Sequence, residues 1–129
     1  MQYLYYFANT SLVVRLLTYL AKQITLTLHS ATVIYLVDRW VVRIQLEAPL
    51  SVTQQLNFKA FLNENGYEYD SSPSVTQALQ GLDLGLSLTE VMNRYHTVVV
   101  SHGALQPADV EEFKDRFVRG LGYCPPSLV

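Results

Sequence analysis

The sequence predicts an α+β protein, in which helices pack on a mainly antiparallel β-sheet. Short β-branched and aromatic runs alternate with helical patterns, and two neighbouring runs are separated by only two residues, as in a β-hairpin. Through residue 70 the expected order is strand, helix, strand, strand, helix, strand. This order is the ferredoxin-like βαββαβ unit, whose two helices cover one face of the sheet.

The first two elements are an aromatic strand and a strongly apolar helix. Residues 2–8 (QYLYYFA) suit a buried strand because they are rich in aromatic side chains. The helix expected over 11–24 has only a narrow polar stripe, so apolar side chains, Leu16 and Leu20 among them, occupy most of its circumference. Such a helix is expected to be covered on more than one side.

A β-hairpin is expected over 32–37 and 40–47, with a tight turn between the two strands. The second strand alternates cleanly, which predicts one buried face and one solvated face. The preceding residues 25–31 either lengthen the first strand or form a loop. The side chains expected to point inward are Trp40, Val42, Ile44 and Leu46.

The second helix has clear start and stop signals. Ser51 followed by Gln54 forms a capping box, and Gly66 suits the C-terminal end. A short strand is expected at 67–69, directly after this glycine. The helix is expected to pack through four apolar side chains, Leu56, Phe58, Phe61 and Leu62.

The remaining residues predict a C-terminal helix/strand/helix extension. Two helical patterns, each beginning at a serine, precede a valine-rich strand and a final helix with its acids early and its bases late. These segments are 74–82, 87–95, 96–101 and 107–122. We expect a single α+β domain over 1–129, with a βαββαβ core over 1–70 and a helical extension with one strand over 74–122.

Charge and cysteine content exclude several classes of protein. The net charge is −2 and no basic run occurs, so nucleic-acid binding is not expected. Cys124 is the single cysteine, which excludes an internal disulfide. Charged and polar residues interrupt the apolar N-terminal segment before it is long enough to cross a bilayer. We therefore expect a cytoplasmic protein without membrane insertion.

An excess of apolar residues predicts a partner. The chain is 50% hydrophobic and 16% charged, whereas soluble domains average about 25% charged residues. The second face of the sheet needs cover, either from the segment after Pro73 or from another copy of the chain. We expect a homodimer, or a complex with another protein, whose interface includes the N-terminal helix, at Leu16 and Leu20, or the adjacent edge of the sheet.

The candidate ligand site is the end of the valine-rich strand, Ser101-His102-Gly103. A loop between a strand and a helix, here 101–106, is a common place to hold a small anion, and Arg94 lies nearby in the sequence. The alternative is that Gly103 permits a turn while Ser101 and His102 make local hydrogen bonds.

The histidines do not form a metal-binding pattern, since His96 and His102 lie too far apart along one strand to share an ion. No phosphate-binding glycine motif is present, and no cofactor is expected. Ser101 and His102 are adjacent on a strand and point to opposite faces, so they are not expected to pair as nucleophile and base. The sequence favours a small, non-enzymatic interaction or regulatory protein that self-associates. The alternative is a small-ligand or anion-binding protein, or a modest enzyme, that uses the 101–106 loop.

Overall fold

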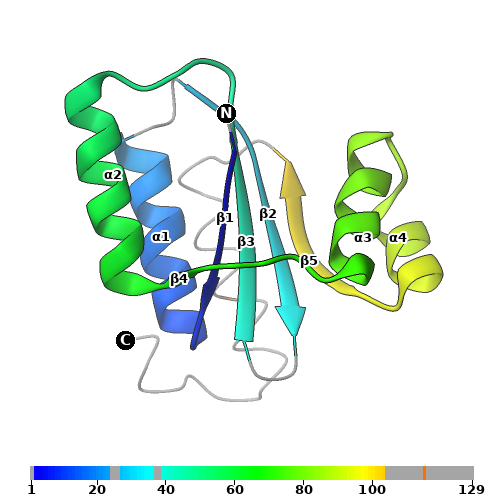
Figure 1. Cartoon of the computed structure of the whole chain (residues 1–129). Coiled ribbons are helices and arrows are strands. Elements are labelled where there is room, and N and C mark those ends of the chain that lie inside the picture. The colour runs from blue at the N-terminus through cyan, green and yellow to red at the C-terminus, as the bar shows by residue number, and fades with distance from the viewer. Residues whose placement is uncertain (1, 24–26, 37–38, 104–114, 116–129) are drawn as a thin grey trace.

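The computed structural model describes residues 2–23, 27–36, 39–103 and 115. Its centre is an antiparallel five-stranded sheet with the strand order β4-β1-β3-β2-β5 (Figure 1). The first six elements follow the predicted order, and their strand order β4-β1-β3-β2 is that of the ferredoxin-like unit. The elements are β1 (Gln2–Phe7), α1 (Thr10–Gln23), β2 (Leu28–Leu36), β3 (Arg39–Leu46), α2 (Val52–Asn65), β4 (Tyr67–Glu68), α3 (Pro73–Asp83), α4 (Leu88–Tyr95) and β5 (Val98–Gly103).

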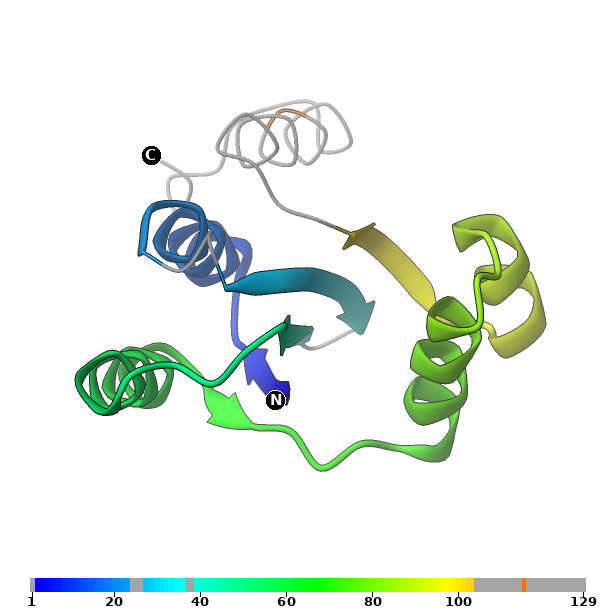
Figure 2. The ribbon, with the colours of Figure 1, turned by 90° about the horizontal axis from the view of Figure 1, so that it is seen from above.

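Helices lie on both faces of the sheet. α1 and α2 cover one face, whereas α3 and α4 pack on the other (Figures 1 and 2). The segment after Pro73 therefore supplies cover for the second face, which was one of the two alternatives. In the extension two helices precede β5, as the two serine-capped helical patterns predict. The final helix predicted over 107–122 lies outside the described residues.

The first hydrophobic cluster fills the space between α1, α2 and the sheet. α1 contributes Leu16 and Leu20, each 0% exposed. This burial differs from the predicted interface at Leu16 and Leu20, since both leucines fill the core of their own chain. α1 is apolar on several sides because α2 as well as the sheet covers it, and Tyr19 stacks on Phe61 of α2 with ring centroids 4.3 Å apart. β3 contributes Trp40, Val42, Ile44 and Leu46, as its alternation predicts.

The second hydrophobic cluster lies between the opposite sheet face and α3 and α4. Val41 of β3 is 0% exposed there, with Ile34 of β2 and Val99 of β5 beside it in the cluster. This face of the hairpin was predicted to meet solvent, and that prediction was wrong because α3 and α4 fold back over it. The two helices contribute Val75, Ala78, Leu79, Leu82 and Val91.

The helix starts follow local capping rules. Ser51 accepts a hydrogen bond from the Gln54 backbone N–H at 3.2 Å, and Gln54 Oε1 accepts one from the Ser51 N–H at 3.3 Å, which confirms the capping box. α3 begins earlier than predicted. Its N-cap is Ser72 rather than Ser74, and Pro73 occupies a position in the first turn that tolerates the missing N–H.

Gly66 ends α2 and also permits a close approach between segments. Its N–H donates to the carbonyl oxygen of Leu62 at 2.9 Å. A Cβ at this position would lie 2.6 Å from the Tyr6 carbonyl oxygen and 2.6 Å from Cε1 of Phe7. Only glycine fits, so the chain can pass directly from α2 into the β4 pairing with β1.

Three local features refine the sequence predictions. β2 begins at Leu28, so part of the segment 25–31 lengthens the strand. β4 contains only Tyr67 and Glu68. Leu56 was predicted to pack but is 66% exposed, because α2 turns a narrow face, with Phe58 and Leu62 buried, toward the core.

A β-bulge interrupts the pairing of β2 with β5. Val33 pairs with Ser101 and Ile34 pairs with Val99, so the ladder skips Val100. Val99 belongs to the second hydrophobic cluster, whereas Val100 packs against the first. β5 thus contributes apolar side chains to both faces of the sheet.

Two leucines on α2 test this packing. Leu62→Ala should lower the free energy of unfolding by about 2–5 kcal/mol, because Leu62 is 0% exposed and its truncation leaves a cavity. Leu56→Ala is the matched control on the same helix and should change that free energy by less than about 0.5 kcal/mol. Urea unfolding measures both values, and equal costs would contradict the orientation of α2.

Candidate functional site

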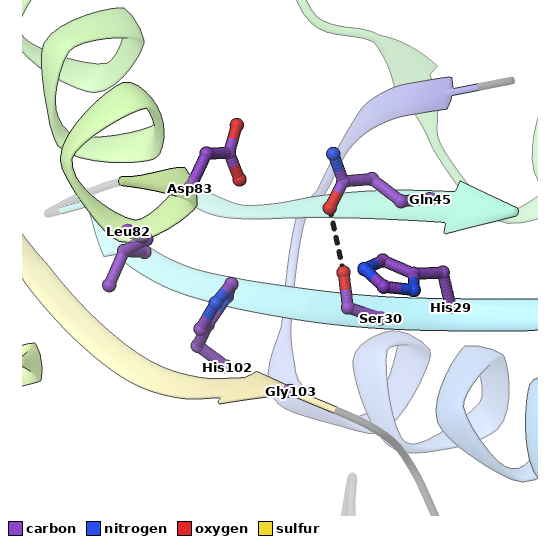
Figure 3. A pocket seen from close by; sticks show the side chains of 7 residues that line it. All are labelled: His29, Ser30, Gln45, Leu82, Asp83, His102 and Gly103. Atoms are coloured by element: carbon purple, nitrogen blue, oxygen red, sulfur yellow. Dashed lines mark hydrogen bonds between the residues drawn. The ribbon is translucent and has the colours of Figure 1, made fainter. Parts of the chain in front are cut away.

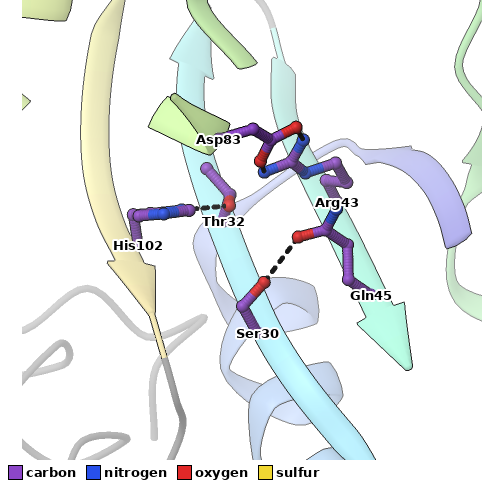
Figure 4. A network of polar contacts seen from close by, with 6 residues as sticks. All are labelled: Ser30, Thr32, Arg43, Gln45, Asp83 and His102. Carbon is purple, nitrogen blue, oxygen red and sulfur yellow. Dashed lines mark hydrogen bonds and ion pairs between the residues drawn. The ribbon is translucent and has the colours of Figure 1, made fainter. Parts of the chain in front are cut away.

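The sheet face that carries α3 and α4 has an apolar part and a polar part. α3 and α4 pack on the apolar part, where Ile34 and Val41 lie. In the ladder, Thr32 pairs with both Arg43 and His102, so three neighbouring strands place these residues in one row. The polar part comprises Ser30, Thr32, Arg43, Gln45 and His102 (Figure 4).

Hydrogen bonds join these polar side chains in pairs (Figure 4). Thr32 is 0% exposed, and its Oγ1 lies 2.7 Å from Nδ1 of His102. Ser30 is also buried and donates from its hydroxyl to Oε1 of Gln45 at 2.7 Å. The amide nitrogen of Gln45 lies on the side away from Ser30 (Figure 3). The buried hydroxyls are therefore satisfied, while Gln45 keeps N–H donors for another partner.

An ion pair between a buried arginine and an exposed aspartate links the polar part to the end of α3. Nη1 and Nη2 of Arg43 donate to the two carboxylate oxygens of Asp83 at 2.8 and 2.7 Å. The Arg43 side chain is 2% exposed and that of Asp83 44% exposed. A carboxylate in the last turn of a helix opposes the helix dipole, so the Arg43 guanidinium compensates a local mismatch.

Two pockets lie on this sheet face, and Asp83 lines both of them. The polar pocket has a volume of about 660 Å³ and is lined by His29, Ser30, Gln45, Leu82, Asp83, His102 and Gly103 (Figure 3). The arginine pocket has a volume of about 210 Å³ and is lined by Gln2, Leu4, Arg43, Ser71, Thr76, Leu79, Gln80 and Asp83. The polar pocket falls within the range of about 300–1,000 Å³ that small-molecule sites occupy.

The charges around the polar pocket nearly cancel. Burial lowers the pKa of His102 below the ordinary value of 6.5; the Arg43 guanidinium lowers it further, and the Asp83 carboxylate acts in the opposite direction. The His102 imidazole is therefore neutral at pH 7. In a neutral imidazole one ring nitrogen donates a hydrogen bond and the other accepts one. Nδ1 is engaged with Thr32, so Nε2 has the opposite role and is left for another partner. The negative charge of Asp83 is offset by the positive charge of Arg43. At the exposed side, Nδ1 of His29 lies 3.5 Å from Oε1 of Glu47.

The structure brings together only part of the site predicted from the sequence. His102 and Gly103 line the polar pocket, and the φ of Gly103 is 133°, which side chains rarely tolerate. Ser101 is paired with Val33 in the ladder, so these residues form the end of β5 rather than a loop. Arg94 is exposed on α4 and lines neither pocket. The rest of the 101–106 loop, from residue 104, lies outside the described residues.

Sequence reasoning missed the partners of His102. Thr32 lies 70 residues from His102 in the chain, and Arg43 lies 40 residues from Asp83. One local signal was available, because Asp83 is an acid at the end of a helix without a basic residue in its last turn. Such an acid indicates a cation supplied by another element.

The chemistry of the pocket suits hydrogen bonding. It combines a neutral imidazole, a carboxamide and a carboxylate already paired with a guanidinium. Within the described ranges, no group of three or more His, Cys, Asp or Glu residues is arranged to hold a metal ion. Among those same residues, no helix has both the length and the apolar character needed to cross a bilayer.

Comparisons with known proteins bear on the fold. No protein-family model matches the chain, and no curated protein sequence matches it. The crystal structure of the C-terminal domain of MecA is similar, with a TM-score of 0.53 and 12% sequence identity. The match covers 91% of this chain and 98% of that chain. The likeness supports the α+β, ferredoxin-like fold and, at this identity, shows the fold alone.

The lowered pKa of His102 predicts a pH-dependent stability. The unfolded chain takes up a proton on His102 near pH 6.5, whereas the folded chain resists it. As the pH falls through about 6.5, the wild type should lose more free energy of unfolding than His102→Gln, which has no titrating group there. Urea unfolding at about pH 7.5, 6.5 and 5.5 gives the two slopes. Parallel slopes would contradict the neutral, partly buried imidazole.

Proposed function

We propose that the chain is a non-enzymatic binding protein that holds a small, uncharged polar molecule in the polar pocket. One observation carries this proposal. The part of the sheet face beside the end of α3 has a hydrogen-bonded polar floor, and a pocket of about 660 Å³ lies over it. Polar side chains that only filled a core would be expected to be closed over by apolar cover.

An uncharged ligand fits the electrostatics better than the anion considered from the sequence. The Arg43 guanidinium uses two of its N–H groups on Asp83, and the lowered pKa of His102 removes a second positive charge. The free amide of Gln45 and Nε2 of His102 offer directed hydrogen bonds instead. A molecule with several hydroxyl, amide or ring-nitrogen groups matches this set.

A binding role is also favoured over catalysis. Ser30 is the hydroxyl residue that lines the polar pocket, and it donates to the side-chain oxygen of Gln45. An amide oxygen is not a general base, so Ser30 is not activated as a nucleophile. In a catalytic triad a carboxylate holds Nδ1 of the histidine. Here the hydroxyl of Thr32 occupies that position on His102.

Gln45→Leu tests the proposed function. Screening by thermal shift would use uncharged amides, polyols and nucleosides beside matched carboxylates and phosphates. A ligand at about a hundredfold excess over its Kd should stabilise the wild type by about 2.7 kcal/mol. Loss of the Gln45 hydrogen bond, about 0.5–1.5 kcal/mol, should then weaken binding by up to roughly tenfold in a titration.

Gln77→Leu is the matched control, because Gln77 is an exposed glutamine on α3 that lines neither pocket. This variant should bind as the wild type does. The proposal fails if no uncharged compound stabilises the protein, or if Gln45→Leu and Gln77→Leu bind every hit equally well.

Self-association is a second candidate role, and the exposed side of α2 favours it. Val52 and Leu56 are 75% and 66% exposed, and they lie one turn apart on the same helix. Adjacent exposed apolar side chains are a feature of contact surfaces. A second copy would bury this pair, in place of Leu16 and Leu20.

Light scattering tests self-association directly. The wild type should have twice the chain mass of 14.6 kDa, and Leu56→Lys should shift it to the monomer without loss of secondary structure. Lys59→Arg, which keeps the charge of an exposed α2 residue, should leave the mass unchanged. A wild type that is monomeric at high micromolar concentration would rule out this role.

A further inference from the structure

Thr32 forms a hydrogen bond with one ring nitrogen of His102. Its Oγ1 lies 2.7 Å from Nδ1 of the imidazole (Figure 4). The two residues are paired across β2 and β5, so the sheet itself keeps them side by side. A neutral imidazole carries its proton on one of its two nitrogens, and the partner of one nitrogen decides the role of the other. The direction of this hydrogen bond therefore sets what Nε2 can do.

The burial of Thr32 decides which atom donates. Thr32 is 0% exposed, so its hydroxyl hydrogen cannot reach bulk water. Among the described residues, Nδ1 of His102 is the one hydrogen-bond partner of this hydroxyl. If Nδ1–H donated to Oγ1, the hydroxyl hydrogen would be buried without an acceptor, which is unfavourable. The hydroxyl therefore donates to an unprotonated Nδ1, and the imidazole proton lies on Nε2.

Nε2 of His102 is accessible to a ligand. Among the residues that the structure describes, Nε of Arg43 is the one buried side-chain nitrogen or oxygen without a hydrogen-bond partner. Nε2 of His102 has no partner among these residues either, so it is not buried but reaches open space. Because His102 lines the polar pocket, its Nε2–H is a donor available at that pocket.

Gln45 is oriented in the same way by a buried hydroxyl. Ser30 is 6% exposed and donates to Oε1 of Gln45 at 2.7 Å. The amide nitrogen of Gln45 is left without a partner in the described part of the chain, and it too is outside the buried class. Gln45 lines the same pocket as His102. Two hydroxyls of the sheet thus orient two N–H donors of the polar pocket.

Two accessible donors in one pocket favour an acceptor on the ligand. A carbonyl oxygen has two lone pairs and can accept from more than one N–H group. We propose that Thr32 is a positioning residue that fixes His102 as an N–H donor, so that the ligand of the polar pocket presents a carbonyl oxygen to Nε2 of His102. This inference rests on the proposed function, because it concerns the same ligand and the same pocket.

The tautomer of His102 can be measured without any ligand. A long-range proton–nitrogen NMR correlation of the full chain distinguishes a ring nitrogen that carries a proton from one that does not. At about pH 8, where an ordinary histidine is neutral, the proton of His102 should be on Nε2. His102→Gln assigns the signals by their loss. A proton on Nδ1 in the wild type would overturn the proposal.

Thr32→Val removes the hydroxyl and nearly keeps the shape of the side chain. The Nδ1 signal of His102 should shift in this variant, and the share of the Nδ1–H tautomer should rise. Thr32→Ser keeps the hydroxyl and should retain the wild-type pattern. Thr97→Val is the matched control, since Thr97 is also buried but donates to the Tyr95 carbonyl oxygen and lines neither pocket.

The control should leave the His102 signals unchanged. An unchanged Nδ1 signal and tautomer in Thr32→Val would show that Thr32 does not fix the ring. If Thr32→Val does not fold, the wild-type tautomer and its retention in Thr32→Ser carry the test, and a proton on Nδ1 in either protein contradicts the assigned role.

Cyclopentanone and pyrrole test the chemistry of the ligand, since they are five-membered rings of similar size with opposite hydrogen-bonding groups. Cyclopentanone accepts through its carbonyl oxygen, whereas pyrrole donates through its N–H. Cyclopentanone should shift the Nε2 signal of His102 in a saturable manner and bind roughly tenfold more tightly than pyrrole. Gln45→Leu should weaken the cyclopentanone response, and Gln77→Leu should leave it unchanged.

The outcomes separate this inference from the proposed function. Tighter binding of pyrrole than of cyclopentanone at His102 would overturn the inference and retain a binding role for the polar pocket. If the proton is on Nε2 but neither probe nor any compound of the thermal-shift screen binds, the proposed function fails, together with the ligand assigned here. The role of Thr32 in fixing the tautomer is upheld in that case.

Discussion

β3 is hydrogen-bonded to β1 on one side and to β2 on the other, and it has helices on both of its faces. Successive side chains of a strand point to opposite faces, so one register decides which residues meet each helical layer. Trp40 and Val42 enter the first cluster, Val41 enters the second, and Arg43 lies on the same side as Val41. A slip by one residue would direct Arg43 into the apolar cluster under α1 and α2. The position of both cores and of the polar face therefore depends on this strand.

The length of α3 connects the second core to the pockets. α3 covers the sheet face for as long as the strands beneath it present apolar side chains, and it ends at Asp83, where the polar side chains begin. An acid at this end would be unfavourable for the isolated helix, but here it reaches the buried Arg43. The ion pair thus anchors the end of α3 to the sheet, at a residue that lines both pockets.

Local signals were sufficient to predict most of the elements and the fold class. The capping box at Ser51, the stop at Gly66 and the alternation along β3 all depend on residues close together in the chain. Long-range placement was harder. Nothing within a few residues of Leu56 indicates that it faces away from the core, or that Val41 is covered by helices more than thirty positions later in the chain. The same holds for the site.

His102 and Gly103 stood out in the sequence because they end a valine run. Their partners did not, since Ser30, Thr32 and Gln45 are ordinary strand residues until pairing brings them together. Helix propensity and periodicity describe single elements, whereas a pocket on a sheet face is made by strand order. Sequence patterns could therefore point to one wall of the site and not to its floor.

The β-bulge in β5 has a consequence for how that strand can change. Val99 and His102 are three positions apart, and in a regular strand an odd separation would put them on opposite faces. The ladder skips Val100, which reverses the parity, so that Val99 enters the core and His102 the pocket on the same side of the sheet. The unpaired Val100 is therefore what allows β5 to direct Val99 and His102 to the same face. Deleting or inserting one residue there would leave the composition of β5 almost unchanged. It would nevertheless turn the side chains on one side of the bulge to the opposite face of the sheet.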